Sequence, residues 1–231
     1  MISIIIPTYN EEKSIDELIS HLLATKNGQK VEILVVDGGS TDQTKKIAKN
    51  AGARVVISPD KGRASQMNYG AQKASADILY FLHADTFPPV GYANNISKKI
   101  IDGFDCGCFR LKFNDPHPVL SFYAWFTRFN IDVFRFGDQS LFVKKALFQK
   151  VGGFDEELLV MEDQEIVTRL KNRAQFCIIK REVVTSARKY QRFGVFKLQL
   201  IFAIIVFLFY LKISQEVLAH FYKTFMSGEQ H

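Results

Sequence analysis

The 231-residue sequence predicts an α/β fold in which a mostly parallel sheet lies between layers of helices, followed by a helical C-terminal appendage. Three observations predict this arrangement. Short apolar runs alternate with amphipathic segments through the first half of the chain, as expected for a sheet covered on both faces. Polar, acidic segments follow three of these runs, where parallel sheets bind ligands. A long stretch without charge lies near the C-terminus.

The first four strands are expected from short runs rich in Ile, Leu and Val, which occupy Ile2–Ile6, Glu32–Val36, Arg54–Ile57 and Asp77–Leu82. Apolar residues recur at helical spacing over Ser14–Leu23 and Ala64–Ala74, which predicts helices that cover the sheet. Because parallel strands end at the same edge of a sheet, the polar segments 7–12, 37–42 and 83–86 are expected to meet there.

The second half is less regular, and an aromatic-rich segment, Pro116–Phe136, is assigned no element. Further strands are expected at Cys106–Phe113 and Ser140–Val143, with an edge strand at Phe176–Ile179. Helices are expected at Ala146–Val151 and Glu162–Leu170. The chain therefore divides into a main domain, 1–190, with halves 1–86 and 87–190, and an apolar helical tail, 191–231.

The tail carries an uncharged segment, Leu198–Leu211, between Lys197 and Lys212. It is shorter than the roughly 20 residues that a membrane-spanning helix needs. A second helix is expected at Ser214–Phe225. The pattern leaves open attachment to a membrane surface, contact with a second copy of the chain, burial in the core, and a true span.

The charge and composition of the chain limit the kinds of partner that it is expected to bind. The net charge of +6 suits phosphate-rich ligands or an anionic membrane surface, although a solvated basic surface explains it equally. Without a dense Lys/Arg run or a nucleic-acid motif, no nucleic acid is expected. The three cysteines are expected to be free, buried and in a reducing compartment, and a zinc site is not expected. No signal peptide is visible before the first strand, so the cytoplasm is the expected location.

Two of the polar segments carry carboxylates that suit a nucleotide ligand. Asp37 ends a strand before Gly38 and Gly39, so it can accept hydrogen bonds from a base or ribose, or else cap a helix. Asp85 ends the fourth strand, where one carboxylate can hold Mg²⁺ or Mn²⁺ on a diphosphate. His83 can ligate the metal, donate to phosphate, or fill space. The glycine-rich dinucleotide and phosphate-loop motifs are absent.

Further candidates lie at expected helix starts. Lys61 and Arg63, around Gly62, form a phosphate site or an ordinary basic surface, with Gln66 and Asn68 nearby. Glu162 and Asp163 offer a general base for a hydroxyl, or they favour the helix start electrostatically. The turn formed by Gly137, Asp138 and Gln139 is either functional or a plain loop before a strand.

Five motifs occur in an order that resembles family 2 glycosyltransferases, which have the Rossmann-like GT-A fold. They span residues 2 to about 170 and resemble a bacterial subgroup of small transferases. The motifs are Ile4–Glu11, Val35–Asp42, Lys61–Ala64 with Asn68, Phe81–Thr86, and Gly152–Glu156 with Glu162 and Asp163.

The resemblance implies a role for each candidate. Asp85, with His83 beside it, would hold the divalent metal, and Asp163, with Glu162 nearby, would deprotonate the acceptor hydroxyl. The acceptor or donor sugar would lie near Gly137, Asp138 and Gln139, and Arg188 and Tyr190 are hypothesised to reach the diphosphate. The nucleotide would contact Pro7, Thr8, Tyr9, Glu11, Asp37, Gly38, Gly39, Lys61, Arg63, Asn68 and Ala84.

The implied reaction is metal-assisted, inverting transfer from a UDP- or GDP-sugar to a glycan or lipid-linked acceptor, in cell-envelope or exopolysaccharide synthesis. The enzyme would be cytoplasmic or peripheral on the inner face of the membrane. The sequence departs from the family's pattern at two places. His83 takes the first position of the family's D-x-D motif, and Gln164-Glu165 replaces a further aspartate. A nucleotidyltransferase for sugar phosphates and a non-catalytic nucleotide-binding relative remain alternatives, although the G-x-G-x-R loop of the former is absent.

Overall fold

Strands from both halves of the chain join one eight-stranded sheet in the computed structural model, which describes residues 1–135 and 137–227. The order is β3-β2-β1-β4-β7-β6-β8-β5. The first four strands pair in parallel, as predicted, and β7 runs antiparallel to β4. Their bounds are β1 (Ile2–Thr8), β2 (Val31–Asp37), β3 (Arg54–Ile57), β4 (Ile78–Phe81), β5 (Thr86–Phe87), β6 (Cys106–Phe113), β7 (Leu141–Lys144) and β8 (Phe176–Thr185).

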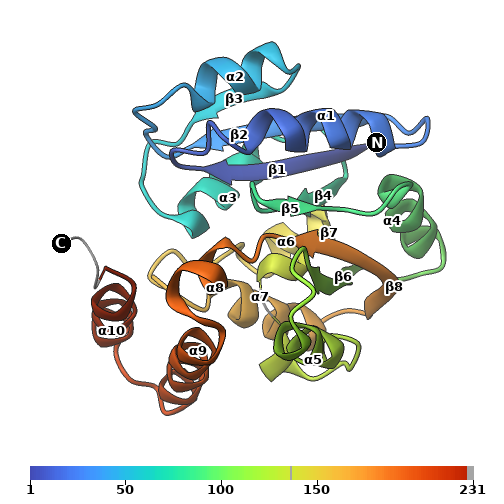
Figure 1. Ribbon diagram of the computed structural model, residues 1–231. Helices are drawn as coiled ribbons and strands as arrows, with labels where there is room; N and C mark the ends of the chain where they lie inside the picture. Colours follow the sequence, from blue (N-terminus) through green and yellow to red (C-terminus); the bar gives the residue numbers. More distant parts are fainter. Residues whose placement is uncertain (136, 228–231) are drawn as a thin grey trace.

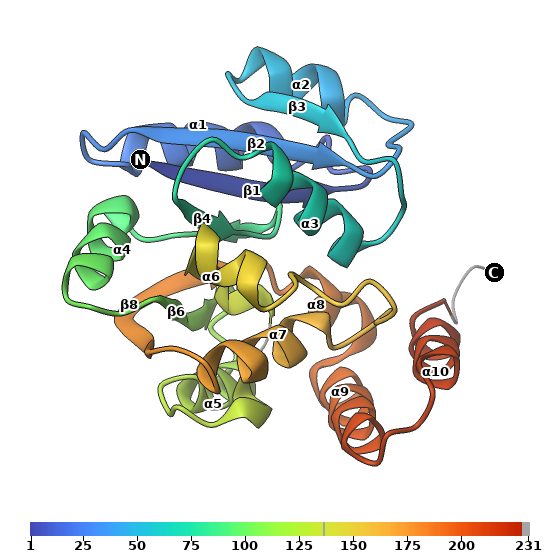
Figure 2. The same ribbon diagram turned by 180° about the vertical axis from the view of Figure 1, so that it is seen from behind.

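Helices cover both faces of this sheet (Figures 1 and 2). One apolar core lies between the sheet and α1 (Ile15–Thr25), α2 (Thr44–Asn50), α4 (Tyr92–Ile101) and α5 (Pro118–Phe126). The other lies under α3 (Arg63–Lys73), α6 (Lys145–Lys150) and α7 (Glu162–Lys171). The predicted α/β sandwich is confirmed.

The alternation of side chains along β1 explains why its sequence is apolar throughout. Ile4 and Ile6 point into the first core, and Ile5 points into the second, as the two-residue period of a strand requires. Helix α3 lies very close to the sheet at Gly70, because an added Cβ would stand 2.5 Å from Cγ2 of Ile5. This close approach brings the start of α3 to the edge of the sheet where β1 and β2 end.

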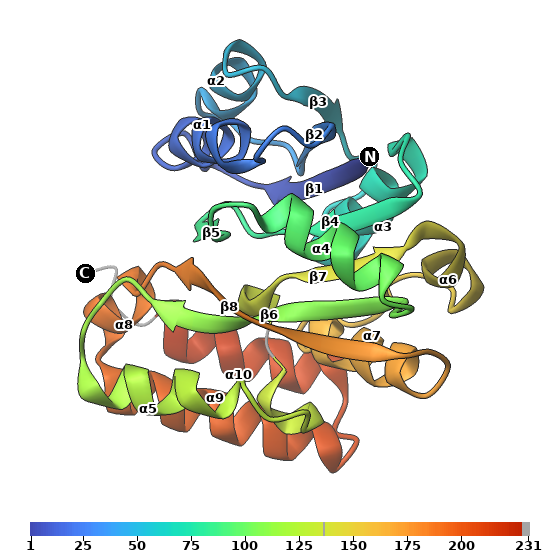
Figure 3. The same cartoon turned by 90° about the vertical axis from the view of Figure 1, so that its right-hand side faces the viewer.

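The C-terminal segment packs on the main body rather than projecting from it. It forms α8 (Arg188–Phe193), α9 (Val195–Tyr210) and α10 (Gln215–Ser227), at the end of the molecule away from α2 (Figures 1 and 3). Leu198 of α9 belongs to the first core, and Ile201 and Ile205 are also buried. Within residues 1–135 and 137–227, no helix has the length and apolar character needed to cross a membrane.

The structure differs from the predictions chiefly in the second half. The segment expected as an edge strand, Phe176–Ile179, is longer than predicted and forms the first part of β8. Among the described residues this part pairs only with β6, because β5 pairs with Val184 and Thr185 at the other end of β8. The aromatic-rich segment forms α5 and the short 3₁₀ turn η1 (Asp132–Phe134), and η2 (Gly137–Gln139) follows. The cysteines are free and buried, as expected.

Candidate active site

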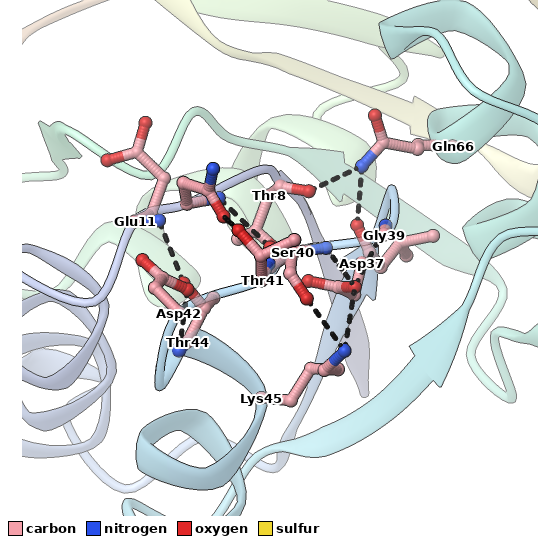
Figure 4. Close-up of polar contacts among 12 residues, drawn as sticks. Thr8, Glu11, Asp37, Gly39, Ser40, Thr41, Asp42, Thr44, Lys45 and Gln66 are labelled. Atoms are coloured by element: carbon pink, nitrogen blue, oxygen red, sulfur yellow. Dashed lines mark hydrogen bonds and ion pairs between the residues drawn. The ribbon is translucent and has the colours of Figure 1, made fainter.

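Asp37 ends β2 as a fully buried carboxylate with one oxygen occupied and one free (Figure 4). Its Oδ2 accepts hydrogen bonds of 2.9 Å from the backbone N–H groups of Gly39 and Ser40, and Nζ of Lys45 lies 3.9 Å away. Among the residues that the structure describes, Oδ1 has no hydrogen-bond partner. Because a buried acceptor without a partner is costly, this atom offers a place for an N–H of a ligand.

The loops after β1 and β2 hold each other in place. The N–H of Asn10 donates to Oγ of Ser40 over 2.9 Å, and the N–H of Thr41 donates to Oδ1 of Asn10 over 2.9 Å. The N–H of Glu11 donates to Oγ1 of Thr44 over 2.8 Å. Because the two loops satisfy each other's backbone groups, they hold a fixed conformation before any ligand binds. We call these loops, residues 9–11 and 37–44, the floor.

Gln66 of α3 ties the ends of the two strands together (Figure 4). Its buried Nε2 donates to the carbonyl of Thr8 at 2.9 Å and to that of Val36 at 2.7 Å. An added Cβ at Gly38 would stand 3.0 Å from this amide, so the glycine leaves room for Gln66. The first glycine after Asp37 therefore serves the packing of α3.

A cleft of about 340 Å³ opens at the carboxyl ends of β1 and β4. Glu11 and Asp85 face each other across Arg188, whose Nη2 lies 3.6 Å from Oε2 of Glu11 and 3.6 Å from Oδ2 of Asp85. Lys189 also lines the cleft. This mixture of carboxylates and cations suits a metal-bound diphosphate. Its lining includes Pro7, Thr8, Tyr9, Glu11, Arg63, His83, Ala84, Asp85, Asp138, Arg188 and Tyr190.

His83 turns toward the acidic residues of the second half. Its Nδ1 lies 3.0 Å from Oδ1 of Asp138, and its Nε2 lies 3.9 Å from Oδ2 of Asp163. Burial and the charge of Arg63 oppose protonation of the ring. The hydrogen bond to Asp138 and the charge of Asp163 outweigh them and raise the pKa of His83. The residue that departs from the family motif thus links two carboxylates.

Asp163 lies at the start of α7, which begins after Met161 in a left-handed conformation (φ 71°). Nη1 of Arg63 lies 3.2 Å from Oε1 of Glu162 and 3.8 Å from Oδ2 of Asp163. Burial and the neighbouring charge of Glu162 raise the pKa of Asp163 to about 6, against the opposing charges of His83 and Arg63. A carboxylate with a raised pKa is better matched to proton transfer near neutral pH.

A second cavity, which we call the chamber, adjoins the cleft and encloses about 450 Å³. Arg63, His83, Asp138, Lys189, Tyr190 and Phe202 line both cavities. Asp163 and Glu162 lie at its polar end, and side chains of α9 and α10 form part of its apolar wall. The site therefore has two compartments that meet beside Asp138 and Asp163.

Four predicted residues take other positions. Asn68 binds the backbone of the following turn, because its Nδ2 donates to the carbonyl of Phe154 over 2.9 Å and its Oδ1 accepts from the same residue's N–H. Lys61 is exposed and lines neither cavity. Gln139 is buried in η2, and Gly137 begins that turn. The remaining predicted residues line the cavities or, like Asp37, Gly38 and Gly39, form the floor beside them.

Sequence reasoning missed Lys189 and Phe202, which line both cavities, and Arg135, which lines the chamber. It named Arg188 and Tyr190, and both line the cleft. The aromatic-rich segment contains two arginines, Arg128 and Arg135, and the sequence does not distinguish the buried Arg135 from the exposed Arg128.

A metal would depend on Asp85 and the ligand together. Within the described residues, no group of three or more His, Cys, Asp or Glu side chains could hold a metal ion. Mg²⁺ in nucleotide sites is commonly held by one or two carboxylates and completed by phosphate oxygens and water. The cleft, with Asp85 on its wall, fits an ion shared with a diphosphate.

The chain is similar in sequence to known glycosyltransferases. The sequence model of glycosyl transferase family 2 matches residues 3–148. Undecaprenyl-phosphate 4-deoxy-4-formamido-L-arabinose transferase of Shewanella sediminis is 30% identical over 113 residues, which is 45% of this chain and 34% of that protein. PGL/p-HBAD biosynthesis glycosyltransferase of Mycobacterium bovis is 26% identical over 84% of this chain and 78% of the relative. The chain thus spans only about a third of some curated relatives.

Solved structures share the fold. The Pyrobaculum calidifontis mannosyltransferase in complex with GDP-Man and Mn²⁺ aligns with a TM-score of 0.73 at 17% identity, covering 97% of this chain and 69% of that one. TarS from S. aureus in complex with UDP-GlcNAc aligns with a TM-score of 0.68 at 22% identity, covering 80% and 58%. With the family model matching well over half of the sequence and the GT-A fold confirmed, the chain belongs to glycosyl transferase family 2.

Proposed function

We propose that this protein transfers a sugar from a nucleoside-diphosphate sugar to an acceptor hydroxyl, with inversion at the anomeric carbon. The observation that supports this most is the junction of the two cavities. The cleft ends at Asp85 beside the nucleotide floor, and the chamber has Asp163 at its polar end. A donor in the cleft and an acceptor in the chamber would meet at this junction.

The donor would be held by groups that already stand in place. Oδ1 of Asp37 would accept an N–H of the base, and Arg188 and Lys189 would neutralise the diphosphate. Asp85 would hold Mg²⁺ or Mn²⁺, which stabilises the charge on the departing diphosphate. The two solved structures named above contain GDP-Man with Mn²⁺ and UDP-GlcNAc, so GDP-sugars and UDP-sugars are both candidate donors for this protein.

Asp163 would act as the general base. It would take the proton of the acceptor hydroxyl while that oxygen forms a bond to the anomeric carbon and the bond to the diphosphate oxygen breaks. Because the attack comes from the side opposite the leaving group, the anomeric configuration inverts. Arg63 and His83 would hold the carboxylate toward the chamber. Asp138, whose pKa is lowered by its hydrogen bond to His83 despite burial, would fix the imidazole.

The decisive experiment is a panel of UDP- and GDP-sugars tested for binding and turnover with Mn²⁺. A nucleotide present at 100 times its Kd stabilises the fold by about 2.7 kcal/mol, which a thermal shift detects. We expect Asp85→Ala to remove the metal-dependent part of that shift, whereas Asp60→Ala in an exposed loop retains it. No shift with any nucleoside diphosphate at millimolar concentration would refute the proposal.

The same panel separates the alternatives. A nucleotidyltransferase would use a nucleoside triphosphate and a sugar phosphate and release pyrophosphate. A non-catalytic relative would bind nucleotide without hydrolysing or transferring the donor sugar. Donor hydrolysis that Asp163→Asn abolishes would exclude the non-catalytic reading.

We further propose that the outer surface of α5 and α9 attaches the protein to an anionic membrane surface. Phe122 and Trp125 on α5 and Phe196, Leu200 and Phe207 on α9 are exposed, and these helices lie at the same end of the molecule (Figure 3). Exposed basic residues flank them, and these are Arg128, Lys197 and Lys212. Apolar groups flanked by cations are typical of interfacial attachment.

A further inference from the structure

The chamber is larger and more apolar than a site that binds only the reacting hydroxyl group of an acceptor would have to be. Its wall carries side chains of β6, α5, α9 and α10, and its volume of about 450 Å³ lies within the range of roughly 300–1,000 Å³ of ligand pockets. A sugar acceptor would leave this wall without apolar contacts. The wall includes Leu111, Phe113, Tyr123, Phe202, Ile205 and Val206.

Arg135 contributes an unpaired charge to this wall. Its side chain is 2% exposed, and Nη1 donates to the carbonyl of Thr127 at 3.1 Å and to Sγ of Cys108 at 3.4 Å. Its Nε and Nη2 have no hydrogen-bond partner anywhere in residues 1–135 and 137–227. A buried guanidinium with two free donors and no carboxylate partner is unfavourable unless a ligand supplies the counter-charge.

Gln164 adds an unpaired acceptor to the same cavity. It follows Asp163 on α7 and is 2% exposed, and its Nε2 donates to the carbonyl of Asp132 over 2.8 Å. Its Oε1 has no partner among the described residues. The wall of the chamber therefore contains two residues with unpartnered polar atoms, Arg135 with two N–H donors and Gln164 with one acceptor, beside apolar side chains.

We propose that the acceptor is an amphiphile: a hydroxyl compound with an apolar body and an anionic group that pairs with Arg135. The apolar body fills the space under α9 and α10, and the reacting hydroxyl lies toward Asp163. Oε1 of Gln164 accepts from a further polar hydrogen of the acceptor. This inference rests on the proposed glycosyl transfer, because it assigns the chamber to the acceptor of that reaction.

Three probes of equal chain length distinguish the parts of this proposal. They are 10-hydroxydecanoate, 10-hydroxydecyl phosphate and 1,10-decanediol, titrated calorimetrically into the protein saturated with Mn²⁺ and the nucleoside diphosphate that binds. We expect at least one anionic probe to bind tenfold or more tighter than the diol, since hydrogen bonds to charged groups contribute about 1.5–3 kcal/mol. Whichever of the two anionic probes binds more tightly shows whether the preferred anionic group is a carboxylate or a phosphate. Shortening the chain from ten to eight and six carbons should weaken binding about threefold to fourfold per methylene.

Two pairs of variants locate the binding site. Arg135→Met should remove the preference for the anionic probe, and Arg128→Met, an exposed arginine in the same region, should keep it. Val206→Trp, which fills the chamber, should weaken all three probes at least tenfold, and Val217→Trp on the exposed face of α10 should not.

Equal binding of the diol and both anionic probes would overturn the proposal, as would a preference that survives Arg135→Met. If circular dichroism shows that Arg135→Met does not fold, the comparison of probes on the wild-type protein decides alone. Nucleotide binding is measured first without any probe. Its absence refutes the proposed transfer, whereas nucleotide binding with no discrimination among probes refutes only the nature of the acceptor.

Discussion

The two halves of the site are built in different ways. The donor side is made by short segments that directly follow β1, β2 and β4, and its loops are joined by backbone hydrogen bonds such as that from Asn10 to Ser40. The acceptor side is assembled from β6, α5, α7, α9 and α10, which come from separate parts of the sequence. On the donor side, among the described residues, Oδ1 of Asp37 and Oγ1 of Thr8 are buried without a hydrogen-bond partner. On the acceptor side Arg135 and Gln164 both have free polar atoms.

This contrast suggests where specificity is encoded. A floor fixed by its own backbone suits a ligand that many relatives share, such as a nucleoside diphosphate. A chamber whose walls come from separate helices can change its shape by substitutions in any one of them, without disturbing the floor. The junction between them, at His83, Asp138 and Asp163, is the place where the two halves must cooperate.

The largest expected effect tests that junction. Asp163→Asn retains the size of the side chain but cannot accept the proton, so we expect kcat for transfer to fall by about 10²–10⁴-fold. Donor binding should change little, because Asp163 lines the chamber and not the cleft. Steady-state transfer assays with calorimetric donor binding check both expectations.

Asp102→Asn, at the exposed C-terminal end of α4, is the matched control and should retain full activity. Transfer by Asp163→Asn within threefold of the wild-type rate would show that the base lies elsewhere.

A smaller effect is expected on the donor side from Asp37→Asn. The asparagine can keep its oxygen on the N–H groups of Gly39 and Ser40, which places its NH₂ where Oδ1 stood. The NH₂ group of the asparagine would then face the N–H of the base, so the hydrogen bond from the base to the carboxylate would be lost. Losing a hydrogen bond to a charged group costs about 1.5–3 kcal/mol. We expect the affinity for the nucleoside diphosphate to fall roughly tenfold to hundredfold in calorimetric titrations, with Asp60→Asn unchanged. An affinity equal to that of the wild type would mean that Oδ1 does not meet the base.

The donor side could be predicted from sequence because its residues are neighbours of strand ends. Asp37, Glu11 and Asp85 each follow an apolar run, and the parallel arrangement of those runs brings them to one edge. Even there, the role of Asn68 in holding the turn at Phe154 depends on a contact between residues far apart in sequence, which no local pattern indicates.

The acceptor side escaped prediction because its residues meet only through tertiary packing. The uncharged segment that forms α9 left burial in the core as one of several possibilities, and nothing in it indicated that Phe202 and Val206 line a cavity beside Asp163. The aromatic-rich segment gave no periodic signal for α5, and Arg135 owes its burial to the 3₁₀ turn that precedes it.

The pH dependence of the reaction sharpens the comparison further. Since burial raises the pKa of Asp163 to about 6 and the base acts when deprotonated, kcat/KM should rise with pH through 6 and level off above it. Below that value it should fall about tenfold per pH unit. The rate profile between pH 5 and 8 measures this, and Asp163→Asn should flatten it. A wild-type profile that is flat over this range would contradict the assignment.

The smallest expected effect concerns the outer surface of α5 and α9, which lies beyond both cavities. Leu200 is 62% exposed on α9, and partial burial of such a side chain in an interface contributes roughly 1 kcal/mol. We therefore expect Leu200→Ser to weaken sedimentation with anionic phospholipid vesicles about fivefold, and Leu23→Ser on α1 to have no effect. Added salt should weaken binding of the wild-type protein, because the flanking cations face anionic lipid. If Leu200→Ser instead dissociates a dimer in analytical ultracentrifugation and leaves vesicle binding unchanged, this surface contacts a second copy of the chain. The helices that form the acceptor chamber would then also form a dimer interface, rather than a membrane-binding surface.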